Sequence, residues 1–197
     1  MKTTTNFKEK GANKSIILPK NAPFLEIIYN KLILRDYKTY EEFKKENFSL
    51  FKKGILQWMK ENQINQNLFY DYFYVCFYSK FVAFKQEEFV AKILKNRYPF
   101  LNVFRASLIY DKFLHVDLIA KSEKIINENN LKNVFFIQVK SKKSNLKLKE
   151  KSKLIKISKN KAVPLLAYKN NKGIWVFEVL NEQDGENIVF LEDIIKF

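Results

Sequence analysis

The sequence has almost no means of covalent cross-linking, because it contains a single cysteine, Cys76, among 197 residues. No disulfide can form within these residues, and no zinc site built from cysteines can be assembled. A chain with one cysteine suits a reducing compartment. We therefore expect a cytoplasmic location.

Long apolar runs are also missing. No uncharged stretch reaches the roughly 18 apolar residues that a bilayer span requires, and residues 1–14, MKTTTNFKEKGANK, lack the apolar core of a signal peptide. We expect a soluble, intracellular protein without a membrane partner. The alternative is a peripheral membrane protein that uses the basic and aromatic segments described below, but the strand patterns around the basic segment argue against it.

Acidic residues are in short supply as well. The chain has 36 lysines and arginines against 21 aspartates and glutamates, which gives a formal net charge of +15. A field of that sign attracts polyanions over about one Debye length, roughly 8–10 Å. Nucleic acid is the expected partner and an anionic membrane surface the second, although frequent lysine and asparagine are also typical of an AT-rich genome.

The first 80 residues have a largely helical pattern. Residues 1–15 are predicted to be a loose polar lead. Apolar residues at helical spacing follow Pro23, and Thr39 with Glu42 three positions later forms the capping box of a second helix. The composition of NQINQN, residues 62–67, is that of a linker.

Residues 68–84, LFYDYFYVCFYSKFVAF, contain nine phenylalanines and tyrosines. If exposed, such a run would stack unpaired bases, at roughly 1–3 kcal/mol for each base. If buried, it would be a helix packed against the other N-terminal helices, with tyrosine hydroxyls at the rim. We favour the buried helix.

The remaining residues change from a helical to an alternating period. EEFVAKILKNRY, residues 87–98, continues as a helix that Pro99 ends. Strands are predicted at 101–110, 112–120 and 133–141, followed by a basic helix at 148–161 and two strands within 164–180 about a turn at Gly173. The expected fold class is α/β. Its core, residues 81–197, has a helix, a three-stranded antiparallel meander, a helix and two further strands, and a helical region precedes it at residues 1–80.

Polar side chains occur in two of these predicted strands. Alternation places Asp117 on one face of the first strand, with Val116 and Leu118 on the other, and it places Gln138 and Lys140 together on one face of the next strand. If the strands are hairpin neighbours, a carboxylate, an amide oxygen and an ammonium converge at one end of the sheet. A hard cation such as Mg²⁺ takes oxygen ligands of this kind and activates a bound water. A nearby lysine can orient or deprotonate that water, or offset charge on a phosphate.

The spacing of these residues resembles that of a known family. VDLIA contains Asp117 and is followed, 21 positions after that aspartate, by Gln-Val-Lys. This pattern is similar to the PD-(D/E)XK nuclease superfamily, in the variant where glutamine replaces the first acid of the second motif, as in Mrr-type restriction nucleases. EEFVAKIL resembles the helix before the sheet in these nucleases, and KAVPLLAYKNNKGIWVFEVL is similar to the closing strands of archaeal Holliday-junction resolvases. The resemblance covers about residues 84–180.

The resemblance implies a restriction-endonuclease-like core with Mg²⁺ as its cofactor, or Mn²⁺ as an alternative. Asp117 would bind the metal, Gln138 would bind it through its side-chain oxygen and Val139 through its backbone carbonyl. Lys140 would be the catalytic lysine. The sequence departs from the family in two ways: Asp117 has no proline before it, and the neutral Gln138 gives the site one negative charge fewer than glutamate would.

A glutamate on the preceding helix would complete the metal site. Glu87 is favoured over Glu88, because Glu87 shares a helical face with Val90 and Leu94, which must point to the sheet. Since Gln138 is neutral, Glu87 or Asp111 would have to supply charge, or the metal would bind fully only with DNA.

Structural interpretations are open for the same residues. Asp117 can be a strand-end acid paired with Lys140, with Gln138 satisfied by a loop. His115, the only histidine, shares the strand face of Asp117. It is more readily a partly buried side chain than an assistant in proton transfer.

Ten lysines lie between Lys140 and Lys161 against one acid, Glu150. A solvated helix face is the usual interpretation of such a run, but its position beside the proposed site favours contact with the DNA backbone. Each lysine that neutralises a phosphate makes the affinity for DNA fall more steeply as the salt concentration rises. Such a contact positions the duplex but does not recognise its base sequence. The predicted contacts are Lys142, Lys143, Lys147, Lys149, Lys151 and Lys153.

The expected function is that of an Mg²⁺-dependent endonuclease acting on double-stranded DNA, as a type II-like restriction or phage-defence enzyme. The N-terminal helices would contribute recognition. A Holliday-junction resolvase-like nuclease and a non-catalytic nucleic-acid-binding protein on a degenerate nuclease fold are the alternatives. Because cuts on opposite strands commonly need two active sites, a homodimer is also expected.

Overall fold

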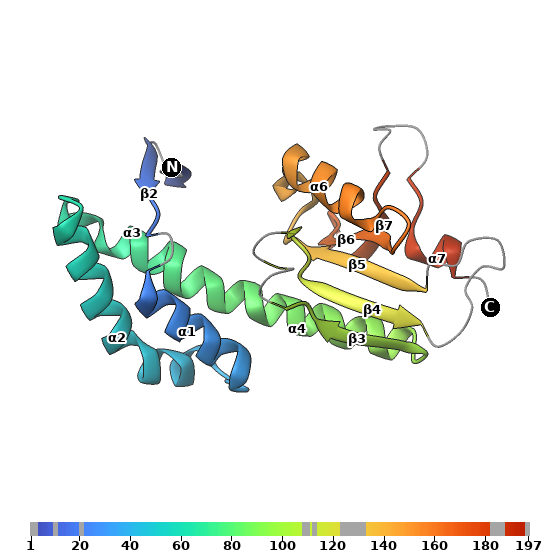
Figure 1. The fold of residues 1–197 in the computed structure, drawn as a ribbon, viewed down its shortest axis with the longest axis horizontal. Coiled ribbons are helices and arrows are strands. Elements are labelled where there is room, and N and C mark those ends of the chain that lie inside the picture. Colours follow the sequence, from blue (N-terminus) through green and yellow to red (C-terminus); the bar gives the residue numbers. More distant parts are fainter. Residues whose placement is uncertain are drawn as a thin grey trace. The chain divides into compact units, whose positions relative to one another are not determined.

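A computed structural model describes residues 4–9, 12–19, 22–107, 111, 114–122, 133–181 and 188–195 (Figure 1). The chain divides into two compact units, Met1–Phe84 and Lys85–Phe197, and the boundary falls within helix α4 (Ser79–Arg97). Among the described residues, no helix has the length and apolar character that a bilayer-spanning segment needs.

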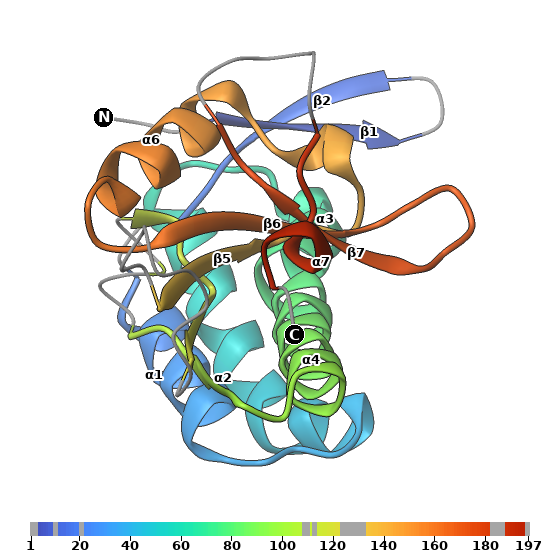
Figure 2. The same ribbon diagram turned by 90° about the vertical axis from the view of Figure 1, so that its right-hand side faces the viewer.

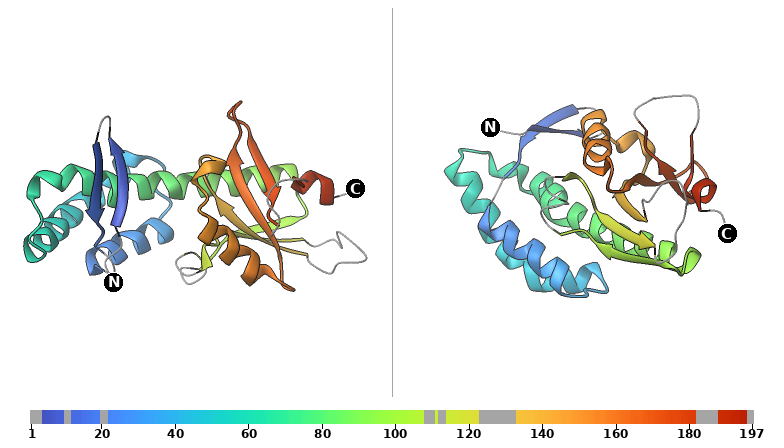
Figure 3. Two further views of the ribbon diagram at one scale, coloured as in Figure 1. Left: turned by 90° about the horizontal axis from the view of Figure 1, so that it is seen from above. Right: turned by 45° about the vertical axis from the view of Figure 1, so that its right-hand side comes forward.

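The first unit opens with a hairpin. Strands β1 (Thr4–Glu9) and β2 (Ala12–Ile17) pair antiparallel, with Thr4 opposite Ile17 (Figure 3). The prediction of a loose polar lead at residues 1–15 is therefore wrong for the described part of that segment. The segment lacks the alternation of apolar and polar residues that indicates a strand in a sequence. Its two strands pair through backbone hydrogen bonds, which do not depend on such a pattern.

Two long helices follow, as the sequence predicts. Helix α1 (Pro23–Leu34) has its proline at the first helical position, where no intrahelical hydrogen bond is lost. Helix α2 (Tyr40–Glu61) begins at the predicted capping box. Thr39 Oγ1 accepts a hydrogen bond from the Glu42 amide (3.2 Å), and the Glu42 carboxylate accepts one from the Thr39 amide (3.4 Å).

The aromatic run forms a continuous helical segment that packs on α2. Its parts are a 3₁₀ turn η1 (Gln66–Leu68), α3 (Phe69–Phe73), a π turn η2 (Tyr74–Tyr78) and the start of α4. All of its rings are buried or half-buried except those of Tyr70 and Tyr74. Phe77, for example, stacks on Phe43 of α2 with ring centroids 4.6 Å apart. This burial supports the packing interpretation of the run.

The π turn has side-chain partners for its backbone. A π turn disturbs the regular helical ladder, and carbonyls there need other donors. The Tyr29 hydroxyl donates to the Cys76 carbonyl (2.8 Å), and Ser79 Oγ donates to the Val75 carbonyl (2.6 Å). Burial raises the pKa of the Cys76 thiol to about 12, so this cysteine is a packing residue and not a nucleophile.

The second unit is built on a five-stranded mixed sheet with the strand order β3-β4-β5-β6-β7. Strands β3 (Leu101–Arg105), β4 (Leu118–Ser122) and β5 (Val134–Val139) form the antiparallel meander. A short turn η3 (Lys143–Asn145) and helix α6 (Leu148–Ser158) lead to β6 (Val163–Lys169), which is parallel to β5. Strand β7 (Trp175–Val179) pairs antiparallel with β6, and α7 (Leu191–Ile194) follows. The predicted α/β class and order of elements are confirmed.

Helices cover both faces of this sheet (Figure 2). On one face, Val90 and Leu94 of α4 pack in one cluster with Ile137 of β5, as predicted. On the other face, Leu154 of α6 packs in a cluster with Phe136 of β5. A strand covered on both sides is expected to be apolar throughout, so polar side chains within β5 need a specific explanation.

The second predicted strand, 112–120, is shorter than expected. Strand β4 begins only at Leu118, because the backbone at His115 has a φ of 57°, a left-handed conformation that breaks the extended chain. The prediction that Val116 shares a face with Leu118 is wrong for the same reason. Val116 packs in the cluster that contains Phe136, whereas Leu118 packs on the opposite face of the sheet.

The first predicted strand, 101–110, ends at Arg105. The amide of Asp111 bonds to the carbonyl of Ser107 (2.9 Å), and the amide of His115 bonds to the carbonyl of Asp111 (3.2 Å). Each of these bonds joins residues four positions apart. Residues 108–110 and 112–113 of the two predicted strands lie outside the described residues.

Candidate functional site

Asp117 immediately precedes β4, and hydrogen bonds of its backbone hold it there. Its amide donates to the carbonyl of Ile137 (2.9 Å), and its carbonyl accepts from the amide of Ala106 (3.0 Å). Its side chain is only 7 % exposed, and Oδ2 accepts hydrogen bonds from Gln138 Nε2 and from the Val139 amide, both at 2.6 Å. The structure therefore brings together the aspartate and the glutamine that the sequence singled out.

Gln138 is 5 % exposed, and only one of the two polar atoms of its side-chain amide has a hydrogen-bond partner among the described residues. Its Nε2 donates to Asp117, which leaves the amide oxygen Oε1 buried without a hydrogen-bond partner among the described residues. A buried acceptor without a donor costs about 1–3 kcal/mol. That cost marks Oε1 as an atom able to accept from a ligand or a cation.

Lys140 continues the line of β5 by one residue. Its amide bonds to the carbonyl of Ala167 in β6 (2.9 Å), and its side chain is mostly buried. The ammonium lies 3.1 Å from Oε2 of Glu150 in α6. The salt-bridge partner of Lys140 is thus Glu150, and not Asp117 as the structural interpretation of the sequence had it.

The two candidate helix glutamates have basic partners. Glu87 of α4 forms an ion pair with Arg105 of β3, and both side chains are largely buried. Glu88 pairs with Lys85 three residues earlier, at 2.7 Å. The metal-binding role of Glu87 stays a prediction, and Arg105 is a charged neighbour that the sequence analysis did not foresee.

The residues fit a weak site for a hard divalent cation. Asp117 supplies a carboxylate, the unpartnered Oε1 of Gln138 supplies a neutral oxygen, and the Val139 peptide is adjacent. Magnesium prefers oxygen ligands and keeps several waters, so one or two carboxylates suffice when a phosphate completes the shell. The described residues include no group of three or more His, Cys, Asp or Glu side chains that could hold a metal alone, so such a site would depend on water and substrate.

His115 lies beside the Lys140–Glu150 pair. Burial lowers its pKa below 6.5, and the charge of Lys153 acts in the same direction, while the charge of Glu150 opposes both. The imidazole is therefore neutral at neutral pH. Its partial burial agrees with the structural interpretation of this histidine.

A second polar cluster lies at the β6–β7 edge of the sheet. The carboxylate of Glu178 is almost fully buried, accepts a hydrogen bond from the Tyr168 hydroxyl (3.1 Å) and pairs with the Lys143 ammonium (2.7 Å). Burial, with the charge of Glu178, raises the pKa of Tyr168 to about 12. In the strand register Gln138 of β5 is opposite Leu166 of β6, and Leu166 is opposite Glu178 of β7, so the two polar residues lie at the same level of the sheet with β6 between them.

Glu150 and Glu178 are mostly buried acids near the predicted site that the sequence analysis did not single out. Both carried a signal: Glu150 is the one acid in a run of ten lysines, and Glu178 interrupts the apolar strand WVFEV. An acid kept within a basic segment, or within a buried strand, is expected to have a cationic partner. Which lysine each acid pairs with follows only from the fold.

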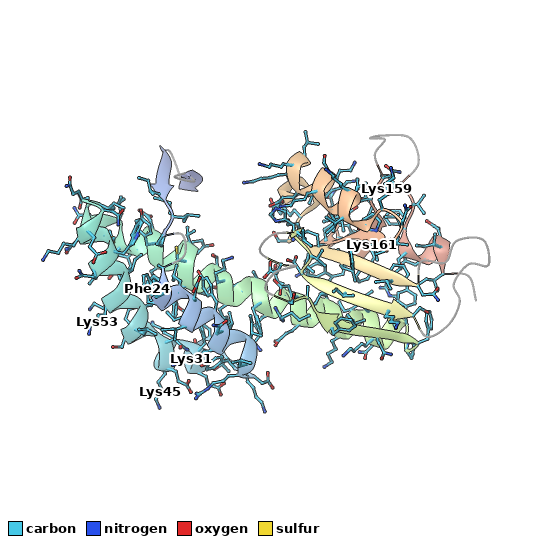
Figure 4. The ribbon with its side chains drawn as sticks, in the orientation of Figure 1. Phe24, Lys31, Lys45, Lys53, Lys159 and Lys161 are labelled. Atoms are coloured by element: carbon cyan, nitrogen blue, oxygen red, sulfur yellow. The ribbon has the colours of Figure 1, made fainter. Side chains whose placement is uncertain are left out.

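The predicted phosphate-contacting lysines differ in exposure. Lys142, Lys143, Lys147 and Lys149 are exposed, whereas Lys151 and Lys153 are half-buried. Lys143 forms a salt bridge with Glu178. Further exposed lysines, Lys159 and Lys161, follow the end of α6 (Figure 4).

No family model and no curated protein matches the chain. Among solved structures, the chain is similar to Hjc from Archaeoglobus fulgidus, a Holliday junction resolvase from an archaeal hyperthermophile. The TM-score is 0.37 at 16 % sequence identity, and the match covers 56 % of this chain and 89 % of that chain.

Proposed function

We propose that the second unit hydrolyses phosphodiester bonds in double-stranded DNA, as a PD-(D/E)XK-type endonuclease dependent on Mg²⁺, or on Mn²⁺ as an alternative. The observation that carries the proposal is the buried contact between Asp117 and Gln138, which leaves Gln138 Oε1 unpartnered beside a carboxylate. The end of the same strand also carries Lys140. We expect a restriction or phage-defence role, with a junction resolvase as the alternative.

The roles follow from the chemistry of each group. Asp117, Gln138 Oε1 and the Val139 carbonyl would hold the ion. When bound, the ion supplies polarisation of the scissile phosphate and a lower pKa for a coordinated water. The Lys140 ammonium would orient that water or offset the negative charge that grows on the phosphate. The exposed lysines before and within α6 would bind the flanking phosphates.

The test is cleavage of plasmid and four-way-junction DNA by the purified protein in Mg²⁺, beside an EDTA control. Asp117→Asn keeps an oxygen acceptor for the Val139 amide, and we expect it to fold and to lose cleavage by at least about 100-fold. Lys140→Ala should lose cleavage similarly. Glu192→Gln is the matched control, because Glu192 is an exposed acid paired with Arg97 on the surface. Wild-type cleavage rates in both Asp117→Asn and Lys140→Ala would refute the assignment.

Two observations favour a second candidate, a nucleic-acid-binding protein without catalysis. Arg105 engages Glu87, and two N–H donors satisfy Asp117 Oδ2 without any metal. This candidate predicts duplex binding of equal strength in Mg²⁺ and in EDTA, with no cutting of plasmid or junction. Any Mg²⁺-dependent cleavage that disappears in Asp117→Asn would exclude it.

A further inference from the structure

Glu150 joins two elements through one carboxylate oxygen. It lies in the first turn of α6, where its Oε2 accepts a hydrogen bond from the Lys147 amide (3.2 Å). The same oxygen lies 3.1 Å from the Lys140 ammonium. The start of α6 is thereby tied to the residue that follows β5.

The position of the Lys140 ammonium depends on this contact. A lysine side chain has a flexible four-carbon stem, and an ammonium without a fixed partner samples many rotamers. The backbone of Lys140 is fixed by the hydrogen bond to Ala167 in β6, which leaves the stem as the mobile part. Both carboxylate and lysine side chains are mostly shielded from water, at 18 % and 21 % exposed, so the contact is little weakened by screening.

The carboxylate is ionised at neutral pH. Burial acts to raise the pKa of Glu150, but the hydrogen bond and charge of Lys140, together with the Lys147 amide and His115, outweigh it, and the pKa lies below the ordinary value of 4.5. The Lys147 amide and His115 act in the same direction as Lys140. Glu150 is therefore a fixed negative charge at the ammonium over the working range of pH.

We propose, resting on the nuclease function proposed above, that Glu150 is a positioning residue that holds the Lys140 ammonium at the Asp117–Gln138 end of β5. Its carboxylate acts through Lys140. Loss of the carboxylate should leave DNA binding intact and slow the cleavage step, because a displaced catalytic group can cost about 10- to 100-fold in rate.

Glu178 in β7 offers a matched control, because its partner Lys143 belongs to the same basic segment as Lys140. It too is a mostly buried acid that pairs with one lysine, Lys143, at 2.7 Å. Glu178→Gln therefore removes a carboxylate of the same type without touching the Lys140 contact. A general effect of losing a buried acid would appear in both variants.

The first measurement needs no enzymatic activity. The full-length protein is acetylated with a limiting amine-reactive ester, and the rate at each lysine is read by peptide mass spectrometry, with the exposed Lys142 as internal reference. Glu150→Gln should raise the rate at Lys140 several-fold and leave Lys143 unchanged, while Glu178→Gln should do the reverse. An unchanged rate at Lys140 in Glu150→Gln would overturn the inference, whatever the protein does to DNA.

The second measurement separates positioning from folding. Under single-turnover conditions in Mg²⁺, Glu150→Gln should cleave about 10-fold more slowly or worse, with a duplex Kd in EDTA within about twofold of wild type. In a Lys140→Ala background the same substitution should have no further effect. An equal additional loss in that background, or a wild-type rate in Glu150→Gln, would refute the positioning role.

Two further outcomes keep the inference separable from the proposed function. If the wild-type protein cuts no DNA, the nuclease proposal fails, and the acetylation result alone decides whether Glu150 holds Lys140. If Glu150→Gln does not fold, Glu150→Asp keeps the charge and withdraws it by one methylene. It should show intermediate values for both the cleavage rate and the Lys140 acetylation rate, and wild-type values for both would count against the role.

Discussion

Each unit buries one amide side chain whose oxygen has no hydrogen-bond partner among the described residues: Asn47 in the first and Gln138 in the second. Asn47 Nδ2 donates to the Phe43 carbonyl of its own helix (2.9 Å) and to the Tyr37 hydroxyl (3.2 Å). Gln138 Nε2 donates to the carboxylate of Asp117, on a neighbouring strand. Burial is the same in the two cases, and the partners differ.

The partners separate a packing element from a candidate ligand. Asn47 lies in α2 beside a core rich in phenylalanine and tyrosine rings, and it links its helix to Tyr37 of that core. Gln138 bonds to a buried carboxylate, and two residues later along the chain Lys140 forms its ion pair with Glu150. Buried ionised groups cost stability that apolar side chains of similar volume would not. The function proposed for the second unit would account for Asp117 and for the Lys140–Glu150 pair.

The largest expected effect tests the claim that the aromatic residues of the first unit serve stability. Phe77 is fully buried and stacks on Phe43 and Phe73, with centroid distances of 4.6 and 5.5 Å. Phe77→Ala should lower the free energy of unfolding by about 3–5 kcal/mol, through lost burial and a residual cavity. Urea unfolding followed by circular dichroism measures it, with the exposed Tyr70→Ala as control, expected to cost less than about 1 kcal/mol.

Replacing Gln138 and Asn47 each with the corresponding acid tests whether only Gln138 lies at a cation site. Gln138→Glu removes the donor to Asp117 and sets two carboxylates against each other, which should cost about 1–3 kcal/mol in EDTA. If the site takes a hard cation, millimolar Mg²⁺ should restore much of the loss in Tm, since ligand binding to the folded state stabilises it. Asn47→Asp should be destabilised at least as strongly, and Mg²⁺ should restore none of it.

Equal responses of these two variants to Mg²⁺ would contradict the assignment of Gln138 as a ligand. A Gln138→Glu protein that is as stable as wild type in EDTA would instead mean that its carboxylate is protonated beside Asp117. A pH titration of Tm separates that case, because a shared proton is lost as the pH rises.

The elements that the sequence predicted are those with strong local signals. The capping box at Thr39 and the order of strands and helices after Pro99 each depend on residues near in sequence, and the structure confirms them. Asp117 and Gln138 were also paired correctly, because hairpin neighbours bring successive strands together. The strand start at Leu118 was not predictable. The backbone at His115 is left-handed, and the usual sequence signal of that conformation, a glycine, is absent at this position.

The partners of the charged residues could not be read from the sequence. Lys140 pairs with Glu150 and Lys143 with Glu178, although any of ten neighbouring lysines was a candidate for either acid. Such choices depend on where α6 packs across the sheet and on the β6–β7 register, which are long-range features. The prediction for residues 1–15 failed for a different reason. The strands of the hairpin β1–β2 are mostly polar, so no apolar alternation in the sequence indicated them.

A smaller effect distinguishes free lysines from the paired one. Lys142 and Lys149 are exposed, and replacing either with glutamine should reduce the slope of log Kd against log salt for duplex DNA by about 0.9. Lys143→Gln should change the slope less, because its ammonium is engaged by Glu178. Fluorescence anisotropy with a labelled duplex, from roughly 50 to 200 mM salt, measures all three. An equal change for Lys143→Gln would mean that its pair with Glu178 opens on binding and that the lysine contacts phosphate.

The smallest expected effect is the pH dependence of the Glu150 contribution to stability. The folded-state pKa of Glu150 lies below 4.5, because burial, which raises it, is outweighed by the combined effect of Lys140, the Lys147 amide and His115. A carboxylate with a depressed pKa stabilises the fold above its unfolded pKa, and this contribution is lost as the pH falls through the folded value. The difference in unfolding free energy between wild type and Glu150→Gln should therefore be constant from neutral pH to about 5 and decline below 4.5. In a Lys140→Met background the decline below 4.5 should be lost or reversed, since burial then acts on the pKa of Glu150 with only the Lys147 amide and His115 opposing it. A difference that grows on acidification would mean that Glu150 is held protonated by its burial, and that it cannot fix an ammonium in the way the second unit requires.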